Sequence, residues 1–335
     1  MRPLTAAFVI AIFVLCQPSP FAWGWSAHGH RVITLLALDG LPEEAPDWLR
    51  EAEYRHRIAH QSNEADRWRS TPALALSHVN RPDHYINIER LDDFGIHFEE
   101  MPRLRHEYLA ALAVAAHEHP ERFTHYDPEL DADRSRLWPG FLPHAMAEHH
   151  AKLRASFLTL RIIEELEDPA RANQLAQARA NAIYHMGMLS HFVGDAAQPL
   201  HTTMHFNGWV GDNPRDYTTN QRFHAFIDGG VVRLHGITYE SLRDREPPRV
   251  EVDAADPWEA IMAHIGRSFE LVVPLYELEL SGALNGRAGG EFIEERLLDA
   301  AATLSALYWS AWRAAEPTQA DASAFMRFDE FEGDE

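Results

Sequence analysis

The segment HFVGDAAQPLH, residues 191–201, combines the end of a predicted helix with three potential metal ligands. His191 and Asp195 are four residues apart, so a helix projects both side chains from one face. Pro199 cannot continue the helix, and the turn that follows allows His201 to return toward the same face. The segment therefore predicts a helix that ends in a site formed by imidazole and carboxylate groups.

A second His–Asp pair strengthens this interpretation. His224 and Asp228, in RFHAFID, repeat the four-residue spacing, and His201 lies between the two pairs in the sequence. A chain with 21 histidines contains some such pairs by chance, but two pairs with an intervening histidine favour a metal site. Imidazole and carboxylate ligands together suit Zn²⁺, and the lack of thiolate ligands favours a catalytic site over a closed structural one.

Helical periodicity extends along most of the chain, while the alternation typical of strands is scarce. Segments rich in proline and glycine, such as WPGFLP at 138–143, separate the helical ranges. No repeat or low-complexity linker divides the chain, so we expect one all-α multi-helix domain over residues 25–326 and an acidic tail over 327–335. Apolar residues at three- and four-residue spacing predict helices at 29–39, 103–119, 143–167, 170–196, 256–279 and 291–314.

Residues 1–24 have the pattern of a secretory signal peptide. Residues 4–16 are apolar and uncharged, Arg2 precedes them, and the run is too short for a comfortable membrane span. The small residues Ala22 and Gly24 favour cleavage after Gly24. We therefore expect a mature chain that begins at Trp25, is periplasmic or secreted, and has no membrane span.

The only cysteine, Cys16, would leave with this segment, so the exported chain would have no disulfide. A lipid anchor on Cys16 is the alternative, but Val14 and Leu15 are not the small residues that lipoprotein processing prefers.

The sequence contains 30 basic and 51 acidic residues, which gives a formal net charge of −21. Such a charge repels polyanions and argues against tight binding of duplex nucleic acid through its backbone. Bound divalent cations would reverse the sign locally within one cleft.

Two further candidate ligands lie upstream, but neither carries a signal by itself. Asp66, in NEADRWR, is equally compatible with a solvated carboxylate beside Arg67 and Arg69. His84, in RPDHYINIE, is equally compatible with a hydrogen-bonded histidine of the core.

Taken together, the segments WSAHGH, EADRW, HYINI, HFVGDAAQPLH and HAFID, in this order, resemble the trinuclear-zinc superfamily. This superfamily comprises secreted single-strand-specific nucleases and bacterial zinc-dependent phospholipases C. The similarity extends from Trp25 to about Asp228, and the motif at 191–201 is its most specific part. It implies an all-α fold and three Zn²⁺ ions.

The resemblance also implies a ligand set. In that family the N-terminal tryptophan binds zinc through its α-amino nitrogen and its carbonyl oxygen. An α-amino group has a pKa of about 7.7–8.0, so it loses its proton to a metal near neutral pH. Carried over, one ion would be held by Asp66, His84, His191 and Asp195, a second by Trp25, His30 and Asp195, and the third by His201, His224 and Asp228.

In such a centre, Asp195 would bridge the two closely spaced ions, and Asp66 would help to orient the attacking water. A water shared by two ions is acidified to hydroxide, and the third ion stabilises the departing oxygen. No dedicated general acid is then required. Arg67 and Arg69 are close enough in sequence to contact the phosphate, although surface solvation is the alternative for at least one of them.

The segment HYINI resembles the nuclease branch, in which the aromatic residue after the ligand histidine stacks on a base. Tyr85 would take that role and Asn87 would hydrogen-bond the base. Packing in the core is the alternative for Tyr85.

Several other histidines leave the ligand set open. His28 is a rival to His30 and His78 a rival to His84. His144, His149 and His150 have no counterpart in the family, and we expect them on a solvated helix face.

We therefore expect a secreted zinc-dependent phosphodiesterase that cuts single-stranded DNA and RNA to 5′-phosphorylated products. The alternatives are a zinc-dependent phospholipase C and a periplasmic protein that binds zinc without turnover. The substrate is expected to be the only partner, and the loops around 85–100 and 203–220 would select it.

Overall fold

The computed structural model describes residues 25–69, 71–123 and 126–329, so the predicted signal peptide and residues 330–335 lie outside the described chain. Within these ranges the fold is all-α, as the sequence predicts, and no strand is formed apart from two isolated bridges. None of the described helices is long and apolar enough to cross a membrane. The helices are α1 (Ala27–Asp39), α2 (Ala52–Gln61), α3 (Glu64–Arg69), α4 (Leu74–Asn80), α5 (Arg105–Glu118), α6 (Leu142–Glu165), α7 (Ala172–Ala197), α8 (Phe223–Ala225), α9 (Val232–Leu234), α10 (Tyr239–Leu242), α11 (Trp258–Phe269), α12 (Val272–Leu280), α13 (Arg287–Arg313) and α14 (Gln319–Asp329).

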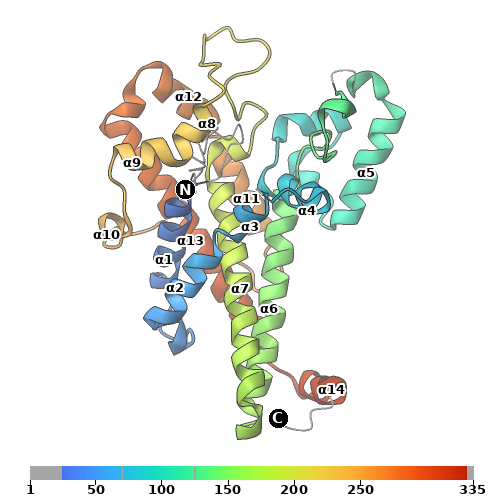
Figure 1. Ribbon diagram of the computed structural model, residues 1–335, viewed down its shortest axis with the longest axis vertical. Coiled ribbons are helices and arrows are strands. Elements are labelled where there is room, and N and C mark those ends of the chain that lie inside the picture. The colour runs from blue at the N-terminus through green and yellow to red at the C-terminus, as the bar shows by residue number, and fades with distance from the viewer. Residues whose placement is uncertain (1–24, 70, 124–125, 330–335) are drawn as a thin grey trace, which may run out of the picture.

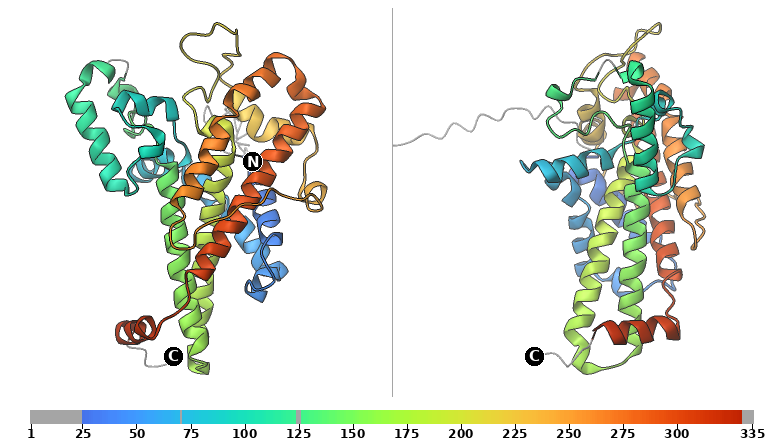
Figure 2. Two further views of the ribbon diagram at one scale, coloured as in Figure 1. Left: turned by 180° about the vertical axis from the view of Figure 1, so that it is seen from behind. Right: turned by 90° about the vertical axis from the view of Figure 1, so that its right-hand side faces the viewer.

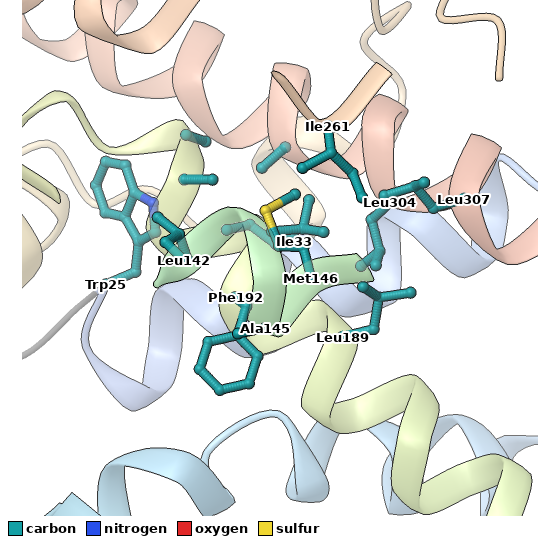
Figure 3. Packing of buried hydrophobic residues seen from close by; sticks show 14 of the residues in the cluster. Trp25, Ile33, Leu142, Ala145, Met146, Leu189, Phe192, Ile261, Leu304 and Leu307 are labelled. Atoms are coloured by element: carbon teal, nitrogen blue, oxygen red, sulfur yellow. The ribbon is translucent and has the colours of Figure 1, made fainter. Parts of the chain in front are cut away.

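The long helices α6 and α7 lie side by side and run in opposite directions (Figures 1 and 2). Helix α13 packs against both of them, and α1 and α2 pack against α7. Their contacts form the hydrophobic core, part of which is drawn in Figure 3. Ile33, Met146, Leu189 and Leu304 are fully buried there. Burying one such side chain stabilises the fold by roughly 1.5–3 kcal/mol, so this core fixes the position of α7.

The C-terminal part of α7 is enclosed on every side, because each residue from Met186 to Ala197 is buried. Two glycines permit the close approach of neighbouring helices. A Cβ atom on Gly187 would lie 2.2 Å from the Cβ atom of Gln61 in α2, and one on Gly194 would lie 2.8 Å from Nδ1 of His30 in α1. The predicted ligands of α7 are thereby brought against α1 and the end of α2.

The predicted helix over 256–279 is two helices, α11 and α12, which meet at Glu270 and Leu271. Pro274 explains the interruption, because it has no amide hydrogen and its ring clashes with the carbonyl group four residues earlier. Residues 327–329, predicted as part of an acidic tail, form the last turn of α14, where Asp329 pairs with Arg171 at 2.8 Å.

Candidate metal centre

The predicted ligands converge at the C-terminal end of α7. They come from α1 and the two residues before it, α3, the 3₁₀ turn Arg81–His84, α7, the 3₁₀ turn Pro199–His201, and the segment from α8 to Val231. Every one of them is buried, a rare state for ionisable groups that are neither paired nor bound to a metal. These residues are Trp25, His30, Asp66, His84, His191, Asp195, His201, His224 and Asp228.

Potential ligand atoms form three groups in which all atoms lie within 4.8 Å of one another: His30, Asp66 and His191; His84, His191 and Asp195; and His201, His224 and Asp228. The third group coincides with a predicted ligand set. The first two groups together contain every side chain predicted to bind the other two ions. His30 was predicted to share an ion with Asp195, but here its nearest group members are Asp66 and His191.

Asp195 occupies the middle of the cluster. Its Oδ2 atom lies 2.9 Å from Nδ1 of His84 and 3.3 Å from Nε2 of His191. Its Oδ1 atom lies 3.5 Å from Nε2 of His30, whose ring stacks on that of His191 with centroids 4.2 Å apart. The two carboxylate oxygens therefore face different histidines, which is the arrangement that a bridging carboxylate needs.

Several buried ring nitrogens and carboxylate oxygens in the cluster have no hydrogen-bond partner among the described residues. They include Nε2 of His201, both ring nitrogens of His224, Oδ2 of Asp228 and Oδ1 of Asp195. Buried polar atoms are normally satisfied, and these point into a cluster of nitrogen and oxygen donors of the kind that Zn²⁺ accepts. The residues present therefore fit a bound metal ion.

Neighbouring groups orient the predicted ligands. Nδ1 of His191 donates to the Ser62 carbonyl at 2.8 Å, and Nδ1 of His201 donates to the His84 carbonyl at 2.5 Å, so Nε2 of each ring is left as the lone-pair donor. The Gln198 amide donates to Oδ1 of Asp228 at 2.6 Å. Such contacts fix the tautomer and ring orientation of metal ligands.

Electrostatics favour the metal-binding protonation state of most predicted ligands; His191 is an exception, because burial alone would lower its pKa but Asp195 raises it above its usual value. Burial lowers the pKa of His30 to about 3 and that of His84 to about 4, so both imidazoles are neutral at pH 7. Burial alone would raise the pKa of Asp195, but His201 and His191 hold it well below its usual range. Burial raises the pKa of Asp228 well above its usual range, a penalty that a cation would offset.

His224 and Asp228 lie at the predicted spacing, with Nε2 and Oδ2 3.3 Å apart, but the helix differs from the prediction. Only Phe223–Ala225 is α-helical, and Phe226–Val231 is a π-helix. Gly230 accommodates the wider turn, since a Cβ atom there would lie 2.5 Å from the Phe226 ring. Single π-helical turns occur often at functional sites.

The structure brings one member of each rival pair of histidines into the cluster. His28 is exposed and hydrogen-bonds the Ile237 carbonyl through Nε2 at 2.8 Å, and His78 hydrogen-bonds the Asp133 carbonyl through Nδ1 at 2.6 Å. Both rings are therefore engaged outside the cluster. His30 and His84 are the members of each pair that lie within it.

Trp25 is fully buried at the start of α1, where the adjoining Ser26 amide donates to the Asp228 carbonyl at 3.0 Å. Close packing against Gly29, whose added Cβ atom would lie 3.0 Å from that of Trp25, holds it in place. The start of α1 is thus fixed beside the segment that supplies Asp228. Ligation through the Trp25 amine stays a prediction.

Tyr85 and Asn87 lie on the extended segment that follows His84. The Ile86 and Ile88 amides donate to the carbonyls of His201 and Thr202, at 2.9 and 3.1 Å, which ties this segment to the metal centre. The Tyr85 ring is half-buried against Gly140. This packing of Tyr85 agrees with the alternative that it is a core residue, and its stacking on a base stays a prediction.

The arginines near Asp66 differ in their surroundings. Arg69 pairs with Asp66 at 2.8 Å and brings a positive charge to the edge of the cluster, whereas the exposed Arg67 pairs with Glu64 at 2.5 Å. Burial alone would raise the pKa of Asp66, but Arg69 lowers it below its usual value, so this carboxylate is ionised at pH 7.

The prediction of a solvated face for three histidines of α6 is wrong. His144 is buried and hydrogen-bonds the Pro102 carbonyl at 2.9 Å, and His150 is buried and hydrogen-bonds the Ser310 hydroxyl at 2.8 Å. Neutral imidazoles with such partners are tolerated in a core. His149 is half-buried against Phe192, with ring centroids 5.4 Å apart.

Comparison with known proteins adds no assignment. No family model matches the chain, and a search of curated proteins finds no match either.

Proposed function

We propose that the chain is a zinc-dependent phosphodiesterase that hydrolyses single-stranded DNA and RNA to 5′-phosphorylated products after export to the periplasm or medium. The observation that carries this proposal is the buried Asp195, whose two oxygens face different histidines in a cluster of unpartnered nitrogen and oxygen atoms. A purely structural core gains nothing from such a cluster, because every unsatisfied group in it costs stability.

Three ions would be held as the resemblance implies. Asp66, His84, His191 and Asp195 would hold the first, the amine and carbonyl groups of Trp25 with His30 and Asp195 the second, and His201, His224 and Asp228 the third. Bound zinc supplies Lewis acidity toward phosphate oxygens and an acidified water.

The chain's own residues would contribute orientation and charge. The Asp66 carboxylate, ionised beside Arg69, accepts a hydrogen bond from the attacking water and thereby orients it. The Arg69 guanidinium offers donors that suit a phosphate oxygen. The Ser62 and His84 carbonyls hold the rings of His191 and His201 in fixed tautomers through each turnover.

The surroundings of the third ligand group favour a substrate that contains bases. Phe206 is 40% exposed, and its ring centroid lies 6.2 Å from that of His224, so a flat apolar surface adjoins the predicted ligands. Exposed aromatic rings of this kind stack on nucleic-acid bases. Tyr85 and Asn87 are proposed as further contacts to the base.

Substitution of Asp195 tests the proposal. Asp195→Asn is expected to lower hydrolysis of single-stranded DNA by at least about 10³-fold and to reduce bound zinc, because a neutral amide is a poor bridge between two dications. Asp131→Asn is the matched control, since Asp131 is also a buried carboxylate but accepts from the Tyr126 hydroxyl and the Arg136 amide, outside the cluster, and it is expected to keep zinc and activity. Near-normal turnover of the Asp195 variant contradicts the proposal. Hydrolysis of phosphatidylcholine by the unmodified enzyme, with nucleic acid left intact, identifies a phospholipase instead.

A further inference from the structure

A small open pocket, whose surface is partly polar and mostly apolar, lies in the groove between α6 and α7, separate from the metal centre. It encloses about 270 Å³ and is lined by Lys152, Ser156, Thr159, Asn181 and His185, with Ala155 and Ala178 as its small apolar residues. Its hydroxyl, amide and ammonium groups are the donors that phosphate oxygens accept from.

Lys152 gives this pocket its charge. It is the only lysine among the 335 residues of an otherwise acidic chain. Its side chain is exposed and makes no ion pair with any side chain in the described ranges. Burial holds the pKa of His149 at about 3 and lowers that of His185, so both neighbouring imidazoles are neutral at pH 7. The exposed ammonium group can meet an anion from solution. It also acts on the buried carboxyl of Asp83, whose pKa is raised by burial and lowered in part by Arg105 and Lys152.

Three aromatic rings lie between the pocket and α3, the helix that carries Asp66. The first of them, Trp68, also donates through Nε1 to the Glu64 carboxylate at 3.0 Å. Trp68, in the same helix as Asp66, lies 6.3 Å from Tyr184, and Tyr184 lies 5.2 Å from His185, both measured between ring centroids. These rings are half-buried, so each is partly open to solvent. His185 precedes the ligand His191 by six residues, which corresponds to about 9 Å along α7.

We infer that this surface binds the substrate strand beyond the scissile bond, with a phosphodiester group of the strand in the Lys152 pocket and a base over Trp68 and Tyr184. Aromatic rings interleaved with positive charge form the usual binding surface for single strands. The inference rests on the proposed nuclease function, and it adds a second contact region that a dinucleotide is too short to reach.

Binding of a single strand to the full zinc-loaded protein tests the inference. The probe is a fluorescent oligothymidylate of about twelve nucleotides with phosphorothioate linkages, which slow hydrolysis. Lys152→Gln is expected to weaken binding roughly three- to fivefold at low salt, as for one exposed ion pair. It is also expected to reduce the slope of log affinity against log salt concentration by about 0.7, the value for one lost phosphate contact.

Two control variants separate the pocket from general charge effects. Lys152→Arg keeps the positive charge and is expected to retain the affinity and the salt slope. Arg287→Gln removes the same charge from the first turn of α13, where Arg287 pairs with the surface residue Glu291. This variant is expected to bind like the unmodified protein. Hydrolysis of a dinucleotide is expected to be equal in all of these proteins.

Each outcome decides one of the two proposals. If Lys152→Gln binds the strand as tightly as Arg287→Gln does, or if the unmodified protein binds no strand, the inference is overturned. If binding depends on Lys152 but no phosphodiester is hydrolysed, the pocket stands and the catalytic proposal fails.

Discussion

Gly194 offers a direct test of how packing positions the metal centre. It lies in α7 between His191 and Asp195, and a Cβ atom added there would lie 2.8 Å from Nδ1 and 3.1 Å from Cε1 of His30. Contacts this short force the His30 ring to move, because the surrounding residues are fully buried. Gly194→Ala therefore displaces a predicted ligand without removing any ligand atom.

The expected effect on stability follows from two opposing contributions. Alanine in a helix interior stabilises by about 1 kcal/mol relative to glycine, while overpacking a core costs about 1–3 kcal/mol. The net change is thus a destabilisation of about 0–2 kcal/mol, and a ligand displaced by as little as 1 Å is expected to lower turnover by about 10²-fold.

Gly266→Ala provides the matched control. Gly266 also lies inside a helix, α11, but the atom nearest to an added Cβ is Cε1 of Phe98 at an ordinary 3.7 Å. This variant is expected to gain up to about 1 kcal/mol with full activity and zinc content. Thermal unfolding, elemental analysis of zinc and turnover on single-stranded DNA compare the two variants. If both behave alike, close packing of Gly194 against His30 does not position the centre.

Three further predictions concern other parts of the site and the core. Gln198→Ala removes the donor to Asp228 and leaves the Leu200 amide without its 2.6 Å acceptor. Zinc affinity, measured by competitive chelator titration, is therefore expected to fall about 10–100-fold, and unchanged affinity refutes this role of Gln198. A chain with one extra residue before Trp25 is expected to bind less zinc and to lose most activity at unchanged helical content, because an amide replaces the predicted amine ligand. If this chain and the chain that begins at Trp25 bind equal amounts of zinc, Trp25 is only a packing residue. Burial lowers the pKa of His150 to about 4, whereas a histidine in the unfolded chain has a pKa of about 6.5. The folded protein is therefore most stable with respect to this group above about pH 6.5, and its stability declines as the pH falls toward 4. His150→Gln is expected to flatten this decline in denaturant titrations, and an unaltered pH profile contradicts it.

Much of the fold follows from local patterns in the sequence. Helices α1, α5, α6, α7 and α13 are predicted because each presents apolar residues at helical spacing toward one core. Helix α2 was not predicted, since only Ile58 and Ala59 are buried in it and its remaining residues are mostly polar. Its position depends on the contact with Gly187 of α7, which local periodicity cannot reveal.

The predicted ligands at 191–228 follow from residue type and spacing, whereas His30, Asp66 and His84 are predicted only from the family resemblance. The contacts that support these side chains are mostly not predictable from the sequence. Gln198 lies within the motif at 191–201, and its position just before Pro199 indicates a residue that caps the following turn. The Ser62 carbonyl that orients His191 carries no such signal, because every residue offers the same backbone acceptor. The burial of His144 and His150 likewise depends on acceptors far away in the sequence, Pro102 and Ser310.

The end of α7 explains why the core and the candidate centre are difficult to separate. The same turn that carries Phe192 and Val193 into the hydrophobic core carries His191 and Asp195 into the cluster. Its rotation is fixed on one side by Gly194 against His30 and on another by His264, whose Nε2 donates to the Val193 carbonyl at 3.1 Å. A small rotation of α7 would therefore disturb the hydrophobic packing and the ligand geometry together. The helix is held by a core that extends to both sides of it, and this support allows it to present buried ionisable groups that would be unfavourable in an isolated helix.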